Sequence, residues 1–297
     1  MRFTSLLWLA VLASLAFTSF SAAAQSTEPV GPAFSSNPEL EKGFLLLYRQ
    51  EFGPAREIFQ TWADQNPAEP FGQVALAATY LFEEFFLQHI LTSDYFLDDK
   101  RFLGGVTGTP DPGRMKNFQD ACGRAKSLSV ARLKRQPRDP EALYALTLCA
   151  GMQSDAESML LKKHLDALKH LKEANSDAAM LLRDHPDAYD AYVAPGVAYY
   201  VIGSLPSSAR FVLWFGGIHG DKELGMAQVQ KTAEDGHYLK PFAQILLALS
   251  ARRERKEALA QKNLKELTEE FPGNAVYDTE YAKALGRPIP ATIGPAN

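Results

Sequence analysis

Histidines and paired carboxylates are the residues of this sequence that could most readily do chemistry. The six histidines are scattered, and His164 and His170 lie six residues apart, which does not place two ligands on one face of a helix. The acidic pairs at 83–84 and 98–99 could supply an acid and a base. Adjacent helical side chains point about 100° apart, however, so such a pair does not converge on one substrate atom. We therefore expect no metal site and interpret both pairs as solvated faces.

The short motifs of common active sites are also missing from the sequence. It contains no HExxH, GxSxG, GxxxxGK[ST] or GxGxxG pattern. Its formal net charge of -4 disfavours a nucleic-acid partner, which would select a basic face. These features predict a protein without catalysis and without a cofactor.

The N-terminus has the features of an export signal. Arg2 precedes an apolar run at 6–17, and three alanines at 22–24 provide the small residues that a signal peptidase needs. We predict a cleavable signal peptide over 1–24, with an uncleaved anchor as the alternative, and a periplasmic or secreted location. The Pro-, Ser- and Gly-rich stretch 25–36 is predicted to be a disordered leader.

Helical patterning begins at Asn37 and covers nearly all of the remaining chain. Apolar residues recur at steps of three and four, helix-forming residues dominate, and alternating β patterns are scarce. Prolines that cannot continue a helix stand at Pro67, Pro137, Pro186 and Pro272. The chain is therefore predicted to be all-α, with helices delimited by these prolines.

Small and large residues recur at fixed places before the prolines. If Pro67 is position 32 of a helix–turn–helix unit, Gly43 falls at position 8, Ala55 at 20 and Phe59 at 24. Gly43 and Ala55 would let two helices cross closely, and Phe59 would fill the wedge beside them. This pattern resembles tetratricopeptide repeats. The resemblance implies a tetratricopeptide-like α-solenoid of about five helix-turn-helix pairs plus a C-terminal cap helix, over residues 37–286.

The stretch 241–272 is the cleanest copy of the repeat, with Ala248 and Ala260 at the expected small positions and nothing inserted. A further helix over 275–285 is similar to the solvating cap that such arrays need. The Pro-rich end, 287–297, is predicted to be a disordered tail.

Two departures from the repeat lie in the first half of the chain. The helix that starts near position 70 runs on into an aromatic stretch at 82–102, and a Gly/Pro loop follows at 104–113. We expect the aromatic stretch to be core, with an aromatic-lined groove as the alternative. A single long helix over 156–184 is predicted to pair with the helix that opens at Pro140, and its residues 163–182 could provide the partner that the extended helix needs.

The third departure is the insertion at 204–220. Its apolar cluster, 211–218, is expected to pack in the core, and a membrane or partner contact is the rival interpretation. The segment 204–236 is also similar to part of divergent tetratricopeptide-like proteins of the inclusion-body-clearance type.

The resemblance further implies a function in binding other proteins. In such arrays the first helices line a concave face, which can hold an extended peptide or a helix. This implies an exported scaffold that mediates protein–protein interaction or assembly in the cell envelope, with a protein or peptide partner and a peripheral membrane contact. On this chain the concave-face positions include Phe71, Val74, Tyr144, Leu148, Val193, Val197 and Tyr200.

The alternative is a small-molecule or lipid-binding protein with an aromatic-lined pocket between the long helices. That alternative predicts a closed apolar cavity of several hundred Å³, typical of such sites, whereas a scaffold predicts an open groove.

The two cysteines, Cys122 and Cys149, form no CxxC motif, so neither a metal site nor a redox motif is indicated. Counted on the repeat, Cys122 lies near the start of a second helix and Cys149 late in the next first helix. Stacked antiparallel helices bring those ends together, so a disulfide between them is geometrically allowed in an oxidising compartment. The alternative is a pair of buried, inert thiols.

Overall fold

Helices and turns account for the whole described chain, which in this computed structural model comprises residues 37–289 apart from residue 216. No strand occurs among these residues, so the all-α prediction is confirmed. The predicted signal peptide, the leader and residues 290–297 of the predicted tail lie outside the described residues.

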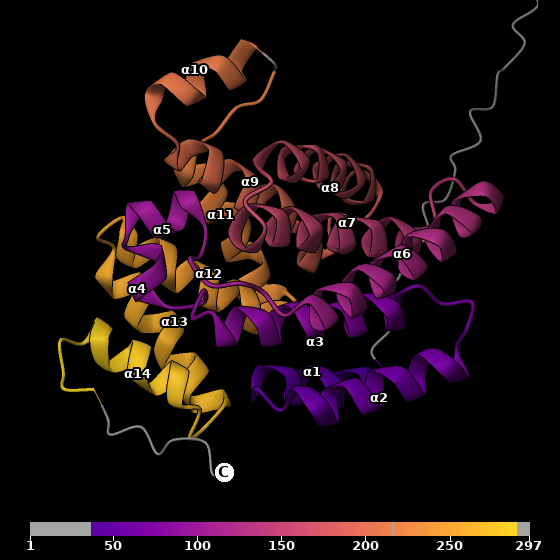
Figure 1. Ribbon diagram of the computed structural model, residues 1–297, viewed down its shortest axis with the longest axis horizontal. Helices are drawn as coiled ribbons and strands as arrows, with labels where there is room; N and C mark the ends of the chain where they lie inside the picture. The colour runs from indigo at the N-terminus through magenta and orange to yellow at the C-terminus, as the bar shows by residue number, and fades with distance from the viewer. Residues whose placement is uncertain (1–36, 216, 290–297) are drawn as a thin grey trace, which may run out of the picture. The chain divides into compact units, whose positions relative to one another are not determined.

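Ten of the helices form five consecutive pairs, each packed against the next along the chain (Figure 1). The first helices of the pairs are α1 (Pro38–Tyr48), α3 (Phe71–Leu87), α7 (Pro140–Asp155), α9 (Val193–Ser204) and α12 (Lys240–Arg253). Their partners are α2 (Phe52–Gln65), α6 (Pro112–Arg135), α8 (His164–Asp184), α11 (Lys222–Asp235) and α13 (Glu257–Glu270). A last helix, α14 (Ala275–Ala284), packs on α13.

Shorter elements interrupt this succession where the sequence departs from the repeat. They are α4 (Ser93–Phe96), α5 (Asp99–Gly104), the π-helical turn η1 (Ala156–Leu160), the 3₁₀ turn η2 (Tyr189–Tyr192) and α10 (Ser207–Phe215). The clean unit, α12 and α13, contains none of them.

Helix starts follow from capping side chains. Asn37 accepts hydrogen bonds from the first-turn amides of α1, Asp139 does so for α7, and Asp221 for α11. Each cap satisfies a backbone N–H that has no partner within its helix. At α1 and α7 a proline follows the cap, where its fixed φ suits the first helical turn.

Close helix crossings require glycine at two places. A Cβ on Gly43 would collide with the ring of Phe59, which is fully buried between α1 and α2. A Cβ on Gly225 of α11 would lie 2.6 Å from the backbone nitrogen of Tyr200 in α9. The small residue at position 43 therefore has the packing role that the sequence pattern predicts for it.

The single helix predicted over 156–184 is wrong. The chain leaves α7 through the π-helical turn η1 and starts α8 only at His164. Lys162 adopts a left-handed backbone conformation with φ of 56°, which ends the preceding turn. The Gly/Pro loop packs on this turn, and the Val106 amide donates to the Met159 carbonyl at 2.8 Å.

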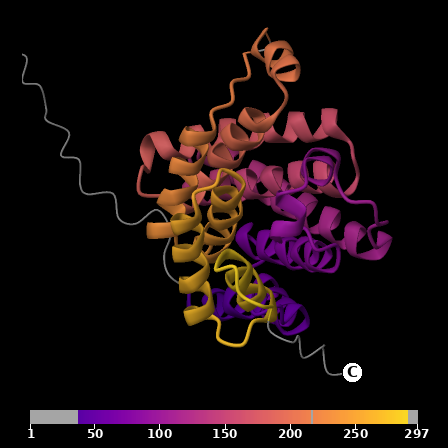
Figure 2. The same ribbon diagram turned by 90° about the vertical axis from the view of Figure 1, so that its left-hand side faces the viewer.

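The N-terminal and C-terminal parts of the array lie side by side (Figures 1 and 2), and side chains join them, so the array closes on itself. The hydroxyl of Tyr48, at the end of α1, donates to the carbonyl of Tyr238 at 2.8 Å. Asn274 Nδ2 and the Tyr277 hydroxyl each donate to the Tyr48 carbonyl at 3.1 Å. The rings of Phe44 and Tyr238 also lie 4.8 Å apart. As a result, the first helices of all pairs face a shared interior.

In the described part of the chain, no helix combines the length and the apolar character that crossing a membrane would require.

Candidate functional site: an apolar interior cavity

The shared interior contains a cavity that is walled by the first helices of all five pairs. Its space free of protein atoms is about 800 Å³, including the part open to solvent. The walls are almost entirely apolar, and among the described residues no Lys, Arg or His side chain lines them. We call it the central cavity. Its lining includes Val74, Leu148, Met152, Val193, Val197 and Phe242.

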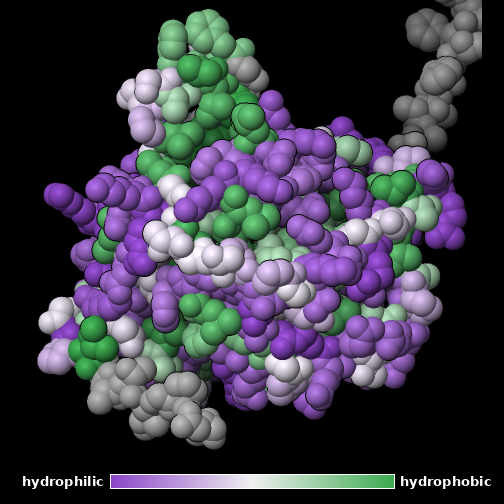
Figure 3. All heavy atoms as spheres, viewed as in Figure 1, coloured by the Kyte–Doolittle hydropathy of each residue, from purple (hydrophilic) through white to green (hydrophobic). Residues whose placement is uncertain are grey.

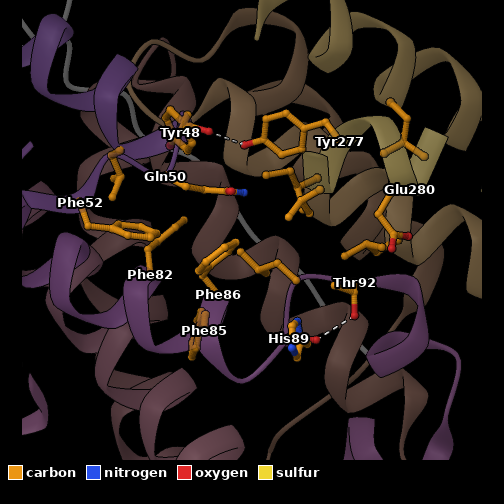
Figure 4. Close-up of a pocket in the computed structure, with 16 residues that line it drawn as sticks. Tyr48, Gln50, Phe52, Phe82, Phe85, Phe86, His89, Thr92, Tyr277 and Glu280 are labelled. Carbon is orange, nitrogen blue, oxygen red and sulfur yellow. Dashed lines mark hydrogen bonds between the residues drawn. The ribbon is translucent and has the colours of Figure 1, made fainter. Parts of the chain in front are cut away.

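A second cavity lies between the N-terminal helices and α14 (Figure 4). It encloses about 660 Å³ on the same measure. Phe52, Phe82 and Phe86 form an aromatic wall on one side, and Tyr277 and Glu280 of α14 face it from the other. We call it the terminal cavity, because it exists only where the two ends of the array meet.

The two cavities adjoin. Leu47, Tyr48, Phe82 and Phe85 line both of them and therefore stand between them. Only a narrow part of each cavity is deep enough to hold atoms of water size, so both suit a slender chain more than a bulky ring system.

The predicted concave-face residues lie on the interior side of the first helices, but they do not form an open groove. Val74, Leu148, Val193 and Val197 line the central cavity. Phe71 and Tyr144 border a neighbouring hollow beside Tyr238. The meeting of the first and last pairs covers this face. Partner binding by Phe71, Val74, Tyr144, Leu148, Val193, Val197 and Tyr200 stays a prediction.

Two tyrosines of that set hold the array together. Tyr144 donates at 3.1 Å to Asp190, a buried carboxylate that also accepts from the backbone amides of His237 and Tyr238 at the start of α12. Burial raises the pKa of Asp190, and these donors oppose that rise. Tyr200 donates to Glu254 at 3.2 Å across to the end of α12.

The predicted aromatic stretch supplies both core and cavity wall. Phe85, Tyr95 and Phe96 are buried, whereas Phe82 is half-buried and Phe86 is exposed along the terminal cavity. Part of the aromatic stretch is therefore core, as expected, and another part lines a cavity, which is closer to the alternative of an aromatic-lined groove.

Sequence reasoning missed Asp155, the last residue of α7, whose side chain lines the central cavity. No described residue forms a hydrogen bond or ion pair with its carboxylate. Burial raises the pKa of Asp155 to about 7. The signal that could have found it is its spacing after Leu148 and Met152, because steps of four and three place a charge on an apolar helix face.

Two buried hydroxyls also have no hydrogen-bond partner among the described residues. One belongs to Thr147 in the cavity wall and the other to Tyr95 near Asp155. Thr147 lines the central cavity, and its Oγ1 is buried without a hydrogen-bond partner. The Tyr95 hydroxyl is likewise buried and unpartnered. Burial, followed by the nearby Asp155 charge, raises the pKa of Tyr95 to about 12. Buried polar groups normally have partners, so such groups together call for an explanation.

The carboxylate of the terminal cavity is paired instead. Glu280 is buried, accepts from the Ser93 amide at 3.0 Å and forms an ion pair with Lys283 at 3.0 Å. The Nη1 atom of Arg252 lies 3.7 Å from the second carboxylate oxygen of Glu280, Oε2. Burial lowers the pKa of Lys283, but the hydrogen bonds that Lys283 donates to Asp94 and Glu280 outweigh this effect and raise it.

The two cysteines lie side by side as free thiols. Cys122 of α6 and Cys149 of α7 are both buried, and a hydrogen bond with Cys149 together with burial raises the pKa of the Cys122 thiol. The proximity that a Cys122–Cys149 disulfide needs is present, and the disulfide itself stays a prediction.

The apolar insertion is not core, which corrects the expectation from the sequence. Helix α10 stands away from the other helices, and hydrophobic surface gathers on it (Figures 1 and 3). Four large apolar side chains of α10 are 56–70% exposed: Phe211, Val212, Trp214 and Phe215.

Among the described residues, no three His, Cys, Asp or Glu side chains come together as metal ligands. Comparisons of the chain with protein-family models, with curated proteins and with solved structures find no significant match.

Proposed function

We propose that this protein is a tetratricopeptide-like array, closed on itself, that binds a slender apolar small molecule in the central cavity. The observation that carries the proposal is the cavity, because side chains from α1, α3, α7, α9 and α12 converge on one apolar space. Concave, mostly apolar pockets with few polar groups are the usual form of small-molecule sites. The proposal includes no catalytic step and no cofactor.

Closure of the array favours a small molecule over a peptide. A peptide lying along the first helices would have to separate Phe44 from Tyr238 and break the hydrogen bond between Tyr48 and the Tyr238 carbonyl. A slender ligand enters space that already exists. We retain the exported location from the sequence as part of the proposal.

A cavity-filling variant tests this function. Gly151 lines the central cavity within α7, and a Cβ there would meet nothing within 4 Å. Gly151→Leu should therefore fill the cavity while improving helix propensity by up to about 1 kcal/mol. The matched control is Gly123→Leu, at an exposed glycine within α6 whose Cβ would also meet nothing.

Binding is measured with the neutral, apolar and rod-shaped fluorophore 1,6-diphenyl-1,3,5-hexatriene. We expect the wild type and Gly123→Leu to bind it alike and Gly151→Leu to bind at least tenfold more weakly. A wild type that does not bind the fluorophore, or a Gly151→Leu variant that binds it like the wild type, would overturn the proposal.

A second candidate function rests on α10. Its exposed apolar residues occur at steps of one, three and four, the arrangement by which a helix inserts into a hydrophobic groove of a partner protein. Trp and Phe are also residue types that dominate binding energy in protein interfaces. We propose that α10 docks into an apolar groove of another envelope protein, which retains the assembly function implied by the resemblance.

The charge of α10 favours a protein groove over a membrane surface. Arg210 is its single charged residue, whereas helices that lie on membranes carry many Lys and Arg on their polar face. The nine residues of Ser207–Phe215 also make little more than two helical turns.

Photo-crosslinking in intact cells distinguishes a protein partner of α10 from a membrane surface. A benzophenone amino acid replaces Val212 in α10 or, as the control, Leu165, an apolar residue of α8 that is 85% exposed. We expect a discrete protein adduct from position 212 that is lost with Phe211→Ser, and none from position 165. Equal adducts from both positions would refute the docking role. Sedimentation with phosphatidylethanolamine and phosphatidylglycerol vesicles that depends on Phe211 would assign α10 to the membrane instead.

A further inference from the structure

We infer that the ligand of the central cavity is a long-chain amine whose cationic head sits on the Asp155 carboxylate, with its apolar chain against the α7 wall. This inference rests on the proposed function and names the chemical class of its ligand.

One face of α7 provides both the carboxylate that would bind the cationic head and the apolar surface that would contact the chain. Leu148, Met152 and Asp155 all line the cavity and lie on one face of the helix. The distance from Leu148 to Asp155 along the helix axis is about 10 Å, at 1.5 Å per residue. An amphiphile aligned with this face would place its head on the carboxylate and its chain on the apolar residues.

The charges around Asp155 leave its carboxylate without a cation. Tyr95 of α4 is the titratable group that interacts with it. On the neighbouring elements, Arg101 of α5 acts on Tyr95, and His170 of α8 lies 2.7 Å from Glu157 of η1. The Asp155 carboxylate is partly buried, and burying a charge without a counter-charge is costly. An ammonium group would supply both the charge and the hydrogen-bond donors that it lacks.

The polar groups of the cavity select against an anionic head. The described residues that line it include no Lys, Arg or His, and besides Asp155 they offer the unpartnered hydroxyl of Thr147. A carboxylate or phosphate head would find no cation there and would face the charge of Asp155. A fatty acid or phospholipid therefore fits less well than an amine.

The local backbone holds the end of α7 in place. Asp155 is followed directly by the π-helical turn η1, and such turns are frequent at functional sites. The loop at 104–113 fixes this turn through the Val106 to Met159 hydrogen bond. Gly105 has a φ of 77°, and a Cβ there would lie 2.6 Å from the Met159 carbonyl oxygen. The inserted loop is thus built to pack against the turn beside Asp155.

Competition among three ten-carbon ligands tests the inference. Decylamine, decanol and decanoate are titrated at pH 8 against bound 1,6-diphenyl-1,3,5-hexatriene, with wild type, Asp155→Asn and Asp166→Asn. Asp166 is an exposed carboxylate of α8, so its variant makes the same charge change away from the cavity.

In the wild type and in Asp166→Asn, we expect decylamine to displace the fluorophore at a concentration at least tenfold lower than decanol, and decanoate to be weakest. In Asp155→Asn, decylamine and decanol should agree within about twofold. In the wild type at pH 5.5 the preference for the amine should shrink several-fold as Asp155 becomes protonated.

The possible outcomes distinguish a failure of the amine inference from a failure of the proposed function, the binding of an apolar molecule. If all three ligands compete equally in the wild type, or if Asp155→Asn keeps the preference for the amine, the amine inference is wrong and apolar binding stands. If the fluorophore does not bind the wild type at all, the proposed function fails as well.

Discussion

Two carboxylates line the adjoining cavities, and their surroundings are opposite. Glu280 accepts from a backbone amide and pairs with Lys283, with Arg252 beyond. Asp155 has no such partner among the described residues, and burial alone raises its pKa. Buried charges in proteins are normally paired, so the paired one has a structural role. The unpaired one is available to a ligand, at a cost in stability.

The largest effect should come from removing the paired carboxylate. Glu280→Leu leaves the Ser93 amide without its acceptor and removes the carboxylate that pairs with Lys283 and lies beside the guanidinium of Arg252. We expect the free energy of unfolding, measured by urea denaturation, to fall by about 3 kcal/mol. Glu223→Leu, which removes an exposed ion pair with Lys256, should change it by less than about 0.5 kcal/mol. Equal losses in the two variants would remove the structural role assigned to Glu280.

Removing the unpaired carboxylate of Asp155 should raise the free energy of unfolding, whereas removing that of Glu280 lowers it. Asp155→Asn relieves a buried charge, so we expect the free energy of unfolding at pH 8 to rise by about 1–2 kcal/mol. The measurement is urea denaturation in the absence of ligand. A loss of stability at pH 8 would mean that Asp155 has a partner in solution, and the contrast with Glu280 would no longer hold.

The pH dependence of stability sharpens the same contrast. Between the ordinary carboxyl pKa of about 3.9 and about 7, the folded protein holds a proton on Asp155 that the unfolded chain releases. The contribution of this group to stability is therefore fully present at low pH and is lost as pH rises through that window. The stability advantage of Asp155→Asn over the wild type should be smaller at pH 5 than at pH 8 by about 1 kcal/mol. An advantage that does not vary with pH would contradict the raised pKa.

The smallest effect concerns the cavity hydroxyl. Thr147→Val removes an Oγ1 that has no hydrogen-bond partner, so thermal unfolding should show a change within about 0.5 kcal/mol. The matched change Thr232→Val removes a hydroxyl that donates to the Tyr189 carbonyl at 2.6 Å, and it should cost about 1 kcal/mol. A Thr147 variant as costly as the Thr232 variant would show that this hydroxyl is bonded.

The local features of the fold could be predicted from the sequence. The prolines after α2, α6, α8 and α13, the caps at Asn37 and Asp139 and the small residue at Gly43 are local signals. The helices begin, end and cross where these residues indicate. The π-helical turn after Asp155 could not be predicted in this way. It depends on the Val106 amide, which comes from a loop about 50 residues earlier in the chain.

The candidate site was only partly predictable, for the same reason. The helical positions of Val74, Leu148, Val193 and Val197 follow from periodicity, and all four do share one space. That this space is closed depends on contacts such as Tyr48 with Tyr238, which are 190 residues apart in the chain. No repeat pattern encodes a contact between its own ends.

Closure of the array also bears on how the chain folds. An open array of repeats is stabilised by neighbours alone, and it can fold from any point and fray at its ends. Here the hydrogen bonds that Asn274 and Tyr277 donate to the Tyr48 carbonyl join segments more than 220 residues apart. Contacts between such distant segments raise the contact order, which slows folding. They also tie the terminal pairs to one another, so the helices should unfold in one cooperative transition, without progressive fraying from either end.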